Sequence, residues 1–341
     1  MSLVELFLDE TPGETRGVLV RDGRCERLVI QREGDIPQHR LGTRCVGRVS
    51  EVRAAYGAAF VDLGVGGAPG FLPLGGRSAL HEGDSLEVEV VSEPRGSKGP
   101  SLRLLGPGQG APRLLVAGPD VETLLKGWAP GAEIVEGLPA IDAALQAEEE
   151  ALSTGFAFPD GVDVAVERTR ALVAVDIDHA ALGGNGGSRA RDRANREGLR
   201  QAARMIRLRS WGGLVVIDLA GSKLNPERVT QAAREAFDGD GAALGPLSRF
   251  GLLQLTIPWT RTPIEERLGE RGGRSALTRA IDLTRRLRRA LICDTASPRL
   301  IARCSPQVAA LAASLVARLG PRAGVAADDR AASDHIDIRE D

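Results

Sequence analysis

The chain has 341 residues with 44 basic and 46 acidic side chains, a formal net charge of −2 at pH 7. This length predicts two or three modules rather than one core, and the balanced charge excludes neither a nucleic acid nor a small metabolite as partner. No apolar run reaches the roughly 18 residues that a membrane span needs, and the amino terminus lacks a signal-peptide pattern. We therefore expect a cytoplasmic protein without a membrane partner.

The four cysteines lie far apart in the sequence, at Cys25, Cys45, Cys293 and Cys304, without a C-x-x-C pair. This spacing argues against a zinc knuckle and against a disulfide framework. We expect these thiols in the apolar core, and no structural zinc.

Short β-type runs fill the first 105 residues. Residues 1–34 read as strands broken by "DETPGE" and by the hairpin signal "RDGR", which predicts a β-meander. Further runs follow at regular spacing: "TRCVGRVSEV", "GAAFVDLG", "PGFLPL", "SLEVEVV" and "PSLRLL". Five such runs in about 65 residues are typical of a small closed barrel of the OB kind.

The second half alternates strands and helices after the linker "GPGQGAP". The run "GVDVAVERTRALVAVDID" predicts strands, residues 188–209 predict a long helix, and "GLVVID" predicts a buried strand. A helix at 226–237, the strand "FGLLQLTI", the helix "ALTRAIDLTRRLRRAL", the strand "LIARCS" and a helix at 306–319 follow. The tail at 323–341 is acidic and lacks apolar periodicity, which predicts disorder.

Two acids end strands that flank the long helix. Asp176 ends "LVAVD" and Asp218 ends "LVVID". Because a right-handed strand–helix–strand crossover makes the strands parallel, their carboxyl ends lie at one sheet edge, about 4.8 Å apart if the strands are neighbours. Functional clefts of open α/β sheets lie at that edge.

Two carboxylates at that distance repel each other, and a shared proton or a bound cation relieves the repulsion. Such oxygen ligands suit Mg²⁺, which keeps most of its waters and joins one or two carboxylates to a phosphate. Asp178 points the same way as Asp176 by strand alternation and is a third ligand or a hydrogen-bond acceptor. The pattern leaves open the alternative that these acids only cap loops or pair with arginines.

Basic and aromatic side chains offer two candidate surfaces. The long helix carries arginines at steps of three and four, which form either a solvated face or a phosphate-attracting one: Arg189, Arg193, Arg196, Arg200, Arg204 and Arg207. The barrel holds Tyr56, Phe60 and Phe71, where outer-face aromatics stack bases and basic residues such as Arg48 follow the backbone. Alternation leaves open whether Phe60 and Phe71 fill the barrel core instead.

Several segments carry more specific patterns in a fixed order: "GRVSEVRAAYGAAFVDLGVGGAPGFLPL", then "ALVAVDID", "RLRSWGGLVVIDL" and "SRFGLLQLT". They resemble the S1 domain and the catalytic core of the ribonuclease E/G family of bacterial endoribonucleases. The resemblance implies an α/β (α+β) multidomain fold. Its parts are an RNase H-like domain formed by 1–37 and 112–170, an inserted S1 (OB-fold) barrel at 38–106, a DNase I-like catalytic domain at 171–265 and a small C-terminal domain at 274–322.

The resemblance implies a metal-dependent endoribonuclease of single-stranded RNA, of the rRNA maturation and mRNA turnover type, that leaves a 5'-phosphate and a 3'-hydroxyl. Asp176 and Asp218 map onto the two magnesium-binding aspartates of the family, with Mn²⁺ as a substitute metal. Asp178, where the family usually has asparagine, assists catalysis. No DNA partner is implied.

For RNA binding, the resemblance places Phe60, Phe71 and Lys98 at S1 positions that hold the substrate strand. Arg249 of "SRFG" is placed near the RNA. With Arg48 on the barrel, these residues are the predicted RNA-binding set.

The chain also departs from the family pattern. Residues 106–160 are too few for the 5'-monophosphate sensor of the family and lack its Val-Arg-Thr signature, so we expect no end sensing. No cysteine-containing zinc link follows the catalytic segment, so a homodimer would not form through zinc. Gly221 and Gln254 stand where the family usually has acids. The intact aspartate pair favours an enzyme; the alternatives are a degenerate RNA-binding protein and a phosphoesterase of small metabolites.

Overall fold

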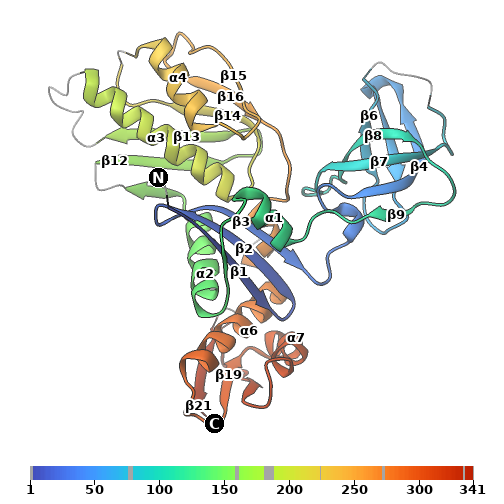
Figure 1. Ribbon diagram of the computed structural model, residues 1–341, viewed down its shortest axis with the longest axis vertical. Coiled ribbons are helices and arrows are strands. Elements are labelled where there is room, and N and C mark those ends of the chain that lie inside the picture. The colour runs from blue at the N-terminus through green and yellow to red at the C-terminus, as the bar shows by residue number, and fades with distance from the viewer. Residues whose placement is uncertain are drawn as a thin grey trace.

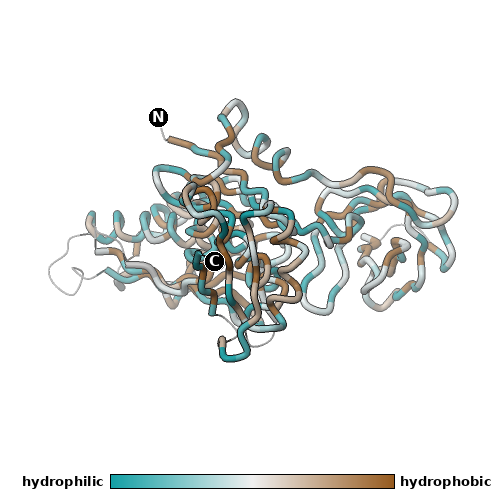
Figure 2. Tube along the Cα trace, turned by 90° about the horizontal axis from the view of Figure 1, so that it is seen from below, coloured by the Kyte–Doolittle hydropathy of each residue, from teal (hydrophilic) through white to brown (hydrophobic). Residues whose placement is uncertain are grey.

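The computed structural model describes residues 3–75, 80–157, 161–179, 188–222, 224–270, 273–332 and 335–340. Two views at right angles both show a barrel standing at one end of the molecule, beside a body that combines the other sheets with the helices (Figures 1 and 2). No helix within these ranges is long and apolar enough to cross a membrane.

The amino-terminal segment is the predicted β-meander. Strands β1 (Val4–Thr11), β2 (Glu14–Arg21) and β3 (Arg24–Arg32) pair antiparallel, and β10 (Ile134–Val135) adds to β1 in parallel. Asp22 and Gly23 turn the β2–β3 hairpin with φ of 50° and 75°, a conformation that Asp and Gly tolerate best. Helix α1 (Val121–Trp128) packs on one face of this sheet, and α2 (Leu138–Leu152) covers the other.

The barrel confirms the predicted closed β-structure. Its strands are β4 (Arg44–Arg53), β5 (Ala58–Asp62), β6 (Gly70–Pro73), β7 (Ser85–Ser92) and β8 (Ser101–Pro107), with 3₁₀ turns η1 (Pro37–His39) and η2 (Ala54–Tyr56). It closes because β4 pairs with both β5 and β7. Strand β9 (Arg113–Val116), which follows the domain boundary predicted at residue 112, adds to β4, so the chain after the linker returns into the barrel sheet.

A six-stranded sheet, called the catalytic sheet because it holds the segment that the sequence predicts to be catalytic, has the order β11-β12-β13-β14-β16-β15. Its strands are β11 (Gly155–Ala157), β12 (Val162–Arg168), β13 (Val173–His179), β14 (Gly213–Asp218), β15 (Ala243–Leu244) and β16 (Leu253–Ile257). Helices α3 (Ser188–Leu208) and α4 (Pro226–Ala236) cover one face through a shared apolar core. Gly198 brings α3 close to β13, since a Cβ there would lie 2.3 Å from a methyl group of Ile177. The other face is open, and Leu214 on it is 41% exposed.

Strand β12 comes before residue 170, the predicted end of the RNase H-like segment. Strand β12 pairs antiparallel with β13 from Val162 to Arg168, so it lies within the catalytic sheet. Moreover, Val18 and Leu28 of the meander share one apolar core with this sheet and with α3. The meander and the catalytic sheet are therefore parts of one body, because each buries its apolar face against the same helices.

The carboxyl-terminal part begins with α5 (Ile264–Leu268) and the short pair β17 (Gly269–Glu270) and β18 (Gly273–Arg274). Helix α6 (Ala276–Cys293), β19 (Leu300–Cys304) and α7 (Pro306–Ala317) follow as predicted. The tail is not disordered as predicted: β20 (Ala323–Ala327) and β21 (Asp337–Glu340) flank β19. Val325, Ile336 and Ile338 pack on the local core, an apolar pattern that the acidic composition hides.

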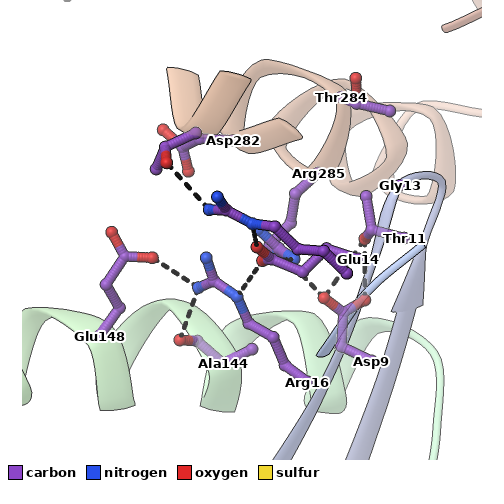
Figure 3. A network of polar contacts seen from close by, with 12 residues as sticks. Asp9, Thr11, Gly13, Glu14, Arg16, Ala144, Glu148, Asp282, Thr284 and Arg285 are labelled. Carbon is purple, nitrogen blue, oxygen red and sulfur yellow. Dashed lines mark hydrogen bonds and ion pairs between the residues drawn. The ribbon is translucent and has the colours of Figure 1, made fainter. Parts of the chain in front are cut away.

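A buried ionic network joins α6 to the meander (Figure 3). Glu14 accepts hydrogen bonds from Arg16 (2.6 Å), from Arg32 (2.8 Å) and from Arg285 of α6 (2.9 Å). Arg285 also donates to Asp9 at 2.6 Å. The C-terminal part is thus held to the first hairpin by charges that are fully enclosed.

Three cysteines are buried as expected: Cys25, Cys45 and Cys304. Burial raises the pKa of the Cys45 thiol to about 11, which makes it an inert core residue. Cys293 departs from the expectation, because it is the last residue of α6 and is exposed.

Candidate active site

The two predicted aspartates lie side by side. Strands β13 and β14 are parallel neighbours, and Asp176 lies directly opposite Asp218 in their register. Both side chains are exposed and alternate with the buried Val175, Ile177 and Ile217, so they project from the open face of the catalytic sheet. The predicted juxtaposition is therefore confirmed, and it follows from the right-handed crossover through α3.

Two further acids lie on the same face. Asp178 follows Asp176 on β13 by one alternation, and Asp163 of β12 is its direct cross-strand partner. Sequence reasoning missed Asp163, although the alternation in "GVDVAVER" places it on one face of its strand. Partial burial and the charges of Asp218, Asp178 and Asp163 raise the pKa of Asp176.

These carboxylates fit a hard cation whose other ligands are not protein side chains. Within the described ranges, no three Asp, Glu, His or Cys side chains converge as a complete metal cage. A neighbouring carboxylate pair instead suits Mg²⁺, which is typically bound by one or two carboxylates together with waters and substrate phosphates. The repulsion that raises the pKa of Asp176 is the electrostatic cost that a cation would remove.

The loop after Asp218 is fixed by one residue of α3. The buried side chain of Asn195 accepts from the backbone N–H of Ala220 at 2.8 Å and donates to its carbonyl oxygen at 3.1 Å. Gly221 follows with a φ of +85°, where a residue with a side chain would be strained. Gln254, the second departure from the family pattern, is exposed on β16 beside Val216, on the same face as the acids.

A turn with an exposed aromatic lies at the same edge. Leu253 pairs with Ile217, so the residues just before β16 lie close to Asp218. In this turn the Arg249 guanidinium stacks 4.7 Å from the ring centroid of Phe250, whose ring is 74% exposed. Sequence reasoning selected Arg249 and missed Phe250, whose position in the glycine-flanked "SRFG" turn was the available signal.

The arginine stripe of α3 mostly serves the fold. Arg204 donates to Glu150 at 2.6 Å and to the carbonyl oxygen of Cys25 at 2.8 Å, and Arg207 chelates Asp240. These partners lie on other elements, so the stripe ties α3 to its neighbours. For Arg204 and Arg207, neither of the two alternatives, a solvated face or a phosphate-attracting one, applies, because their guanidinium groups are engaged within the fold.

Aromatic side chains lie together on the outer face of the barrel. The rings of Phe60 and Phe71 meet edge to face with centroids 6.0 Å apart, and Arg53 stacks 5.2 Å from the Phe60 ring. Neither phenylalanine belongs to the barrel core, Phe71 is 36% exposed, and Tyr56 beside Arg53 is 71% exposed. The question left open by alternation is thus answered in favour of the outer face.

Lys98 and Arg48 lie near this surface. Lys98 is exposed in the β7–β8 hairpin, which the hydrogen bond from Phe71 N–H to Pro100 O, 2.8 Å long, holds against β6. Arg48 is exposed opposite Asp62, one alternation along from Phe60. Arg48, Phe60, Phe71 and Lys98 therefore occupy one side of the barrel.

The barrel surface and the acid pair are not brought together. The barrel contacts the catalytic sheet at the end of the sheet that lies away from the acids. There, Glu93 N–H donates to the carbonyl oxygen of Thr260, just beyond the carboxyl end of β16. The acids lie at the opposite end of the sheet, because Ile257 at the end of β16 pairs with Gly213 at the start of β14, whereas Asp218 ends β14. A ligand that reached both would have to pass along strands about 20 Å long, from a rise of about 3.4 Å per residue.

Comparisons with known proteins agree in one region. Residues 138–259, from α2 to just after β16, match the model of the ribonuclease E/G family. "Ribonuclease E/G-like protein, chloroplastic" of Arabidopsis thaliana is 31% identical over 145 residues, 40% of this chain and 14% of that protein. "Ribonuclease E" of Escherichia coli (strain K12) is 34% identical over 129 residues, 36% of this chain and 12% of that protein. The chain therefore matches only a small part of the length of each relative.

Proposed function

Because residues 138–259 give the chain a domain of the ribonuclease E/G family, we propose that the protein is a Mg²⁺-dependent endoribonuclease of single-stranded RNA. The observation that carries the proposal is the register of Asp176 opposite Asp218 within the matched region. Cleavage would leave a 5'-phosphate and a 3'-hydroxyl, as the family resemblance implies.

Each acid has a separate role in this proposal. Asp176 and Asp218 would hold Mg²⁺, or Mn²⁺ in its place. When bound there, the metal would polarise the scissile phosphate and lower the pKa of the attacking water. Asp178, which accepts the backbone N–H of His179 at 2.7 Å, would orient that water through its free oxygen. The exposed Phe250 ring would stack on a base beside the cleaved bond, with Arg249 on its phosphate.

The domains and the partners of the protein are assigned on the same family resemblance. We assign the meander with α1 and α2 to an RNase H-like domain, and the catalytic sheet with α3 and α4 to a DNase I-like domain. The partner is single-stranded RNA rather than DNA, bound first by the barrel. A homodimer, where one forms, would not depend on zinc.

The test is cleavage of a labelled AU-rich single-stranded RNA by the native chain in Mg²⁺ and in EDTA. We expect cleavage in Mg²⁺ only, and RNA binding in both. Binding without cleavage in either buffer would favour the second candidate, a degenerate RNA-binding protein, for which the observation is Gly221 and Gln254 beside the acid pair. Hydrolysis of a mononucleotide but not of the oligomer would favour a phosphoesterase.

The chain is expected to cleave 5'-triphosphate and 5'-monophosphate forms of one RNA at rates that agree within a few-fold. The reason is that the sequence between the barrel and the catalytic sheet lacks the sensor pattern. Single-turnover rates on the two RNAs give the measurement. A strong preference for the monophosphate would show that another part of the protein reads the end.

Replacing Phe71 by alanine is expected to weaken RNA binding by about 1–3 kcal/mol, the typical contribution of one base–aromatic stack. The rate at saturating RNA should stay unchanged, because the barrel lies at the far edge from the acids. Leu114→Ala is the matched control, since Leu114 is an exposed apolar side chain of β9 on the same barrel. Equal losses in the two variants would mean that Phe71 acts on barrel stability instead.

A further inference from the structure

One arginine beside the loop after Asp218 forms no ion pair with any residue in the described ranges. Arg191 lies in the first turn of α3, and its side chain runs across Gly221 in the loop after Asp218. A Cβ at residue 221 would lie 2.6 Å from the Arg191 Cδ atom. The bare glycine therefore makes the space in which this side chain lies.

Among the arginines of α3, which all lie in the described ranges, Arg191 alone has a buried side-chain nitrogen without a hydrogen-bond partner. Its Nε is buried without a hydrogen-bond acceptor, and within the described ranges no carboxylate pairs with its guanidinium. The neighbouring acid, Asp192, is already engaged by Arg228 at 2.5 Å. A buried N–H without an acceptor is costly, so such groups call for an explanation, and a ligand is one.

The surroundings favour an anion as that ligand. The helix N-terminus beside Arg191 carries partial positive charge. The acids of the site repel a phosphodiester, and no described arginine forms an ion pair with Asp176, Asp178 or Asp218. The Arg191 guanidinium, which lies beside Gly221 in the loop after Asp218, supplies positive charge, and its planar fork matches two phosphate oxygens.

We propose that Arg191 binds a phosphate of the RNA next to the Asp176–Asp218 pair, donating its N–H groups to the non-bridging oxygens. This inference rests on the proposed function, because it takes RNA as the ligand of the acid edge. It makes Gly221 a positioning residue, which leaves room for the Arg191 side chain where any larger residue would displace it.

The first experiment measures RNA affinity in EDTA, where no cleavage occurs, over a range of monovalent salt concentrations. Arg191→Gln is expected to reduce the slope of log K against log salt by about 0.7, the value for one phosphate contact on a single strand. Arg234→Gln is the matched control, since Arg234 is exposed near the far end of α4 and has no ion pair within the described ranges. It should leave the slope unchanged.

The second experiment measures kcat/KM for cleavage in Mg²⁺. Arg191→Gln should lower it by about 10- to 100-fold, as expected for a charge-assisted hydrogen bond. Arg191→Lys should be intermediate, because lysine keeps the charge but not the fork. Melting temperatures close to native would show that both variants fold.

The outcomes separate this inference from the proposed function. If the native chain cleaves and Arg191→Gln binds and cleaves like Arg234→Gln, the role of Arg191 is overturned while the enzyme assignment stands. If the native chain never cleaves, the assignment fails, and the salt slope still decides whether Arg191 contacts phosphate.

Discussion

Replacing Asp218 by asparagine is expected to lower the rate of RNA cleavage by about 10³-fold or more, because the variant loses a metal ligand worth several kcal/mol in the transition state. Asparagine has nearly the same shape as aspartate, so the sheet edge and the hydrogen bonds between its strands should persist. RNA binding in EDTA should stay close to native, because the barrel surface lies at the other edge. Asp176→Asn should behave alike, since it occupies the paired position of the register.

Thermal unfolding gives a readout that does not depend on cleavage. Mg²⁺ should raise the stability of the native chain by about 2.7 kcal/mol at 100 times its Kd, and should not do so in either variant.

Without metal at neutral pH, Asp176→Asn should melt higher than native. The raised pKa of Asp176 means that its ionised form is less favourable in the folded protein. This destabilisation is present above the raised pKa and vanishes in acid, so the gain should vanish there too. An asparagine variant that cuts at the native rate would rule out the metal role.

Replacing Glu14 by glutamine is expected to cost about 3–5 kcal/mol of unfolding free energy, the range for removing one partner of a buried ion pair. Burial opposes the charge of Glu14, but Arg16, Arg285 and Arg32 outweigh it and hold its pKa well below the usual range. Without the carboxylate, Arg16 and the fully buried Arg285 would each lose one of their anionic partners (Figure 3). Urea unfolding measures the loss.

The matched control is Glu33→Gln. Glu33 pairs with Arg318 at 2.8 Å and also joins the meander region to the C-terminal part, but both side chains are more than half exposed. Its removal should cost less than about 1 kcal/mol. A depressed folded pKa gives stability above the ordinary glutamate range and loses it as the pH falls. The native advantage over Glu14→Gln should therefore shrink in acid, and equal costs for the two variants would contradict the network's role.

The strand–helix–strand order was enough to predict the centre of the candidate site. It fixes which strands are parallel, so the register of Asp176 and Asp218 follows from a chirality rule rather than from side-chain detail. Asp163 could not be placed in the same way, because its strand is an antiparallel neighbour and many pairings of "GVDVAVER" are compatible with the sequence.

Other features depend on contacts across long separations. The roles of Arg204 and Arg207 are set by partners on α2 and after α4, which no spacing within α3 reveals. The position of the Arg191 side chain could not be predicted from the sequence, because it depends on the loop that contains Gly221. The tail was misread because composition averages over its acids, whereas Ile336 and Ile338 decide where it packs.

The barrel and the first hairpin differ in when they can become stable during synthesis. The barrel core lies wholly between Cys45 and Leu102, so it can close as soon as that stretch has emerged. The hairpin emerges earlier, but its ionic partners are synthesised later. Arg16 pairs with Glu148, 132 positions further along the chain, and Asp9 pairs with Arg285, 276 positions further along. The hairpin is therefore synthesised before the barrel but completes its ionic contacts after the barrel can fold.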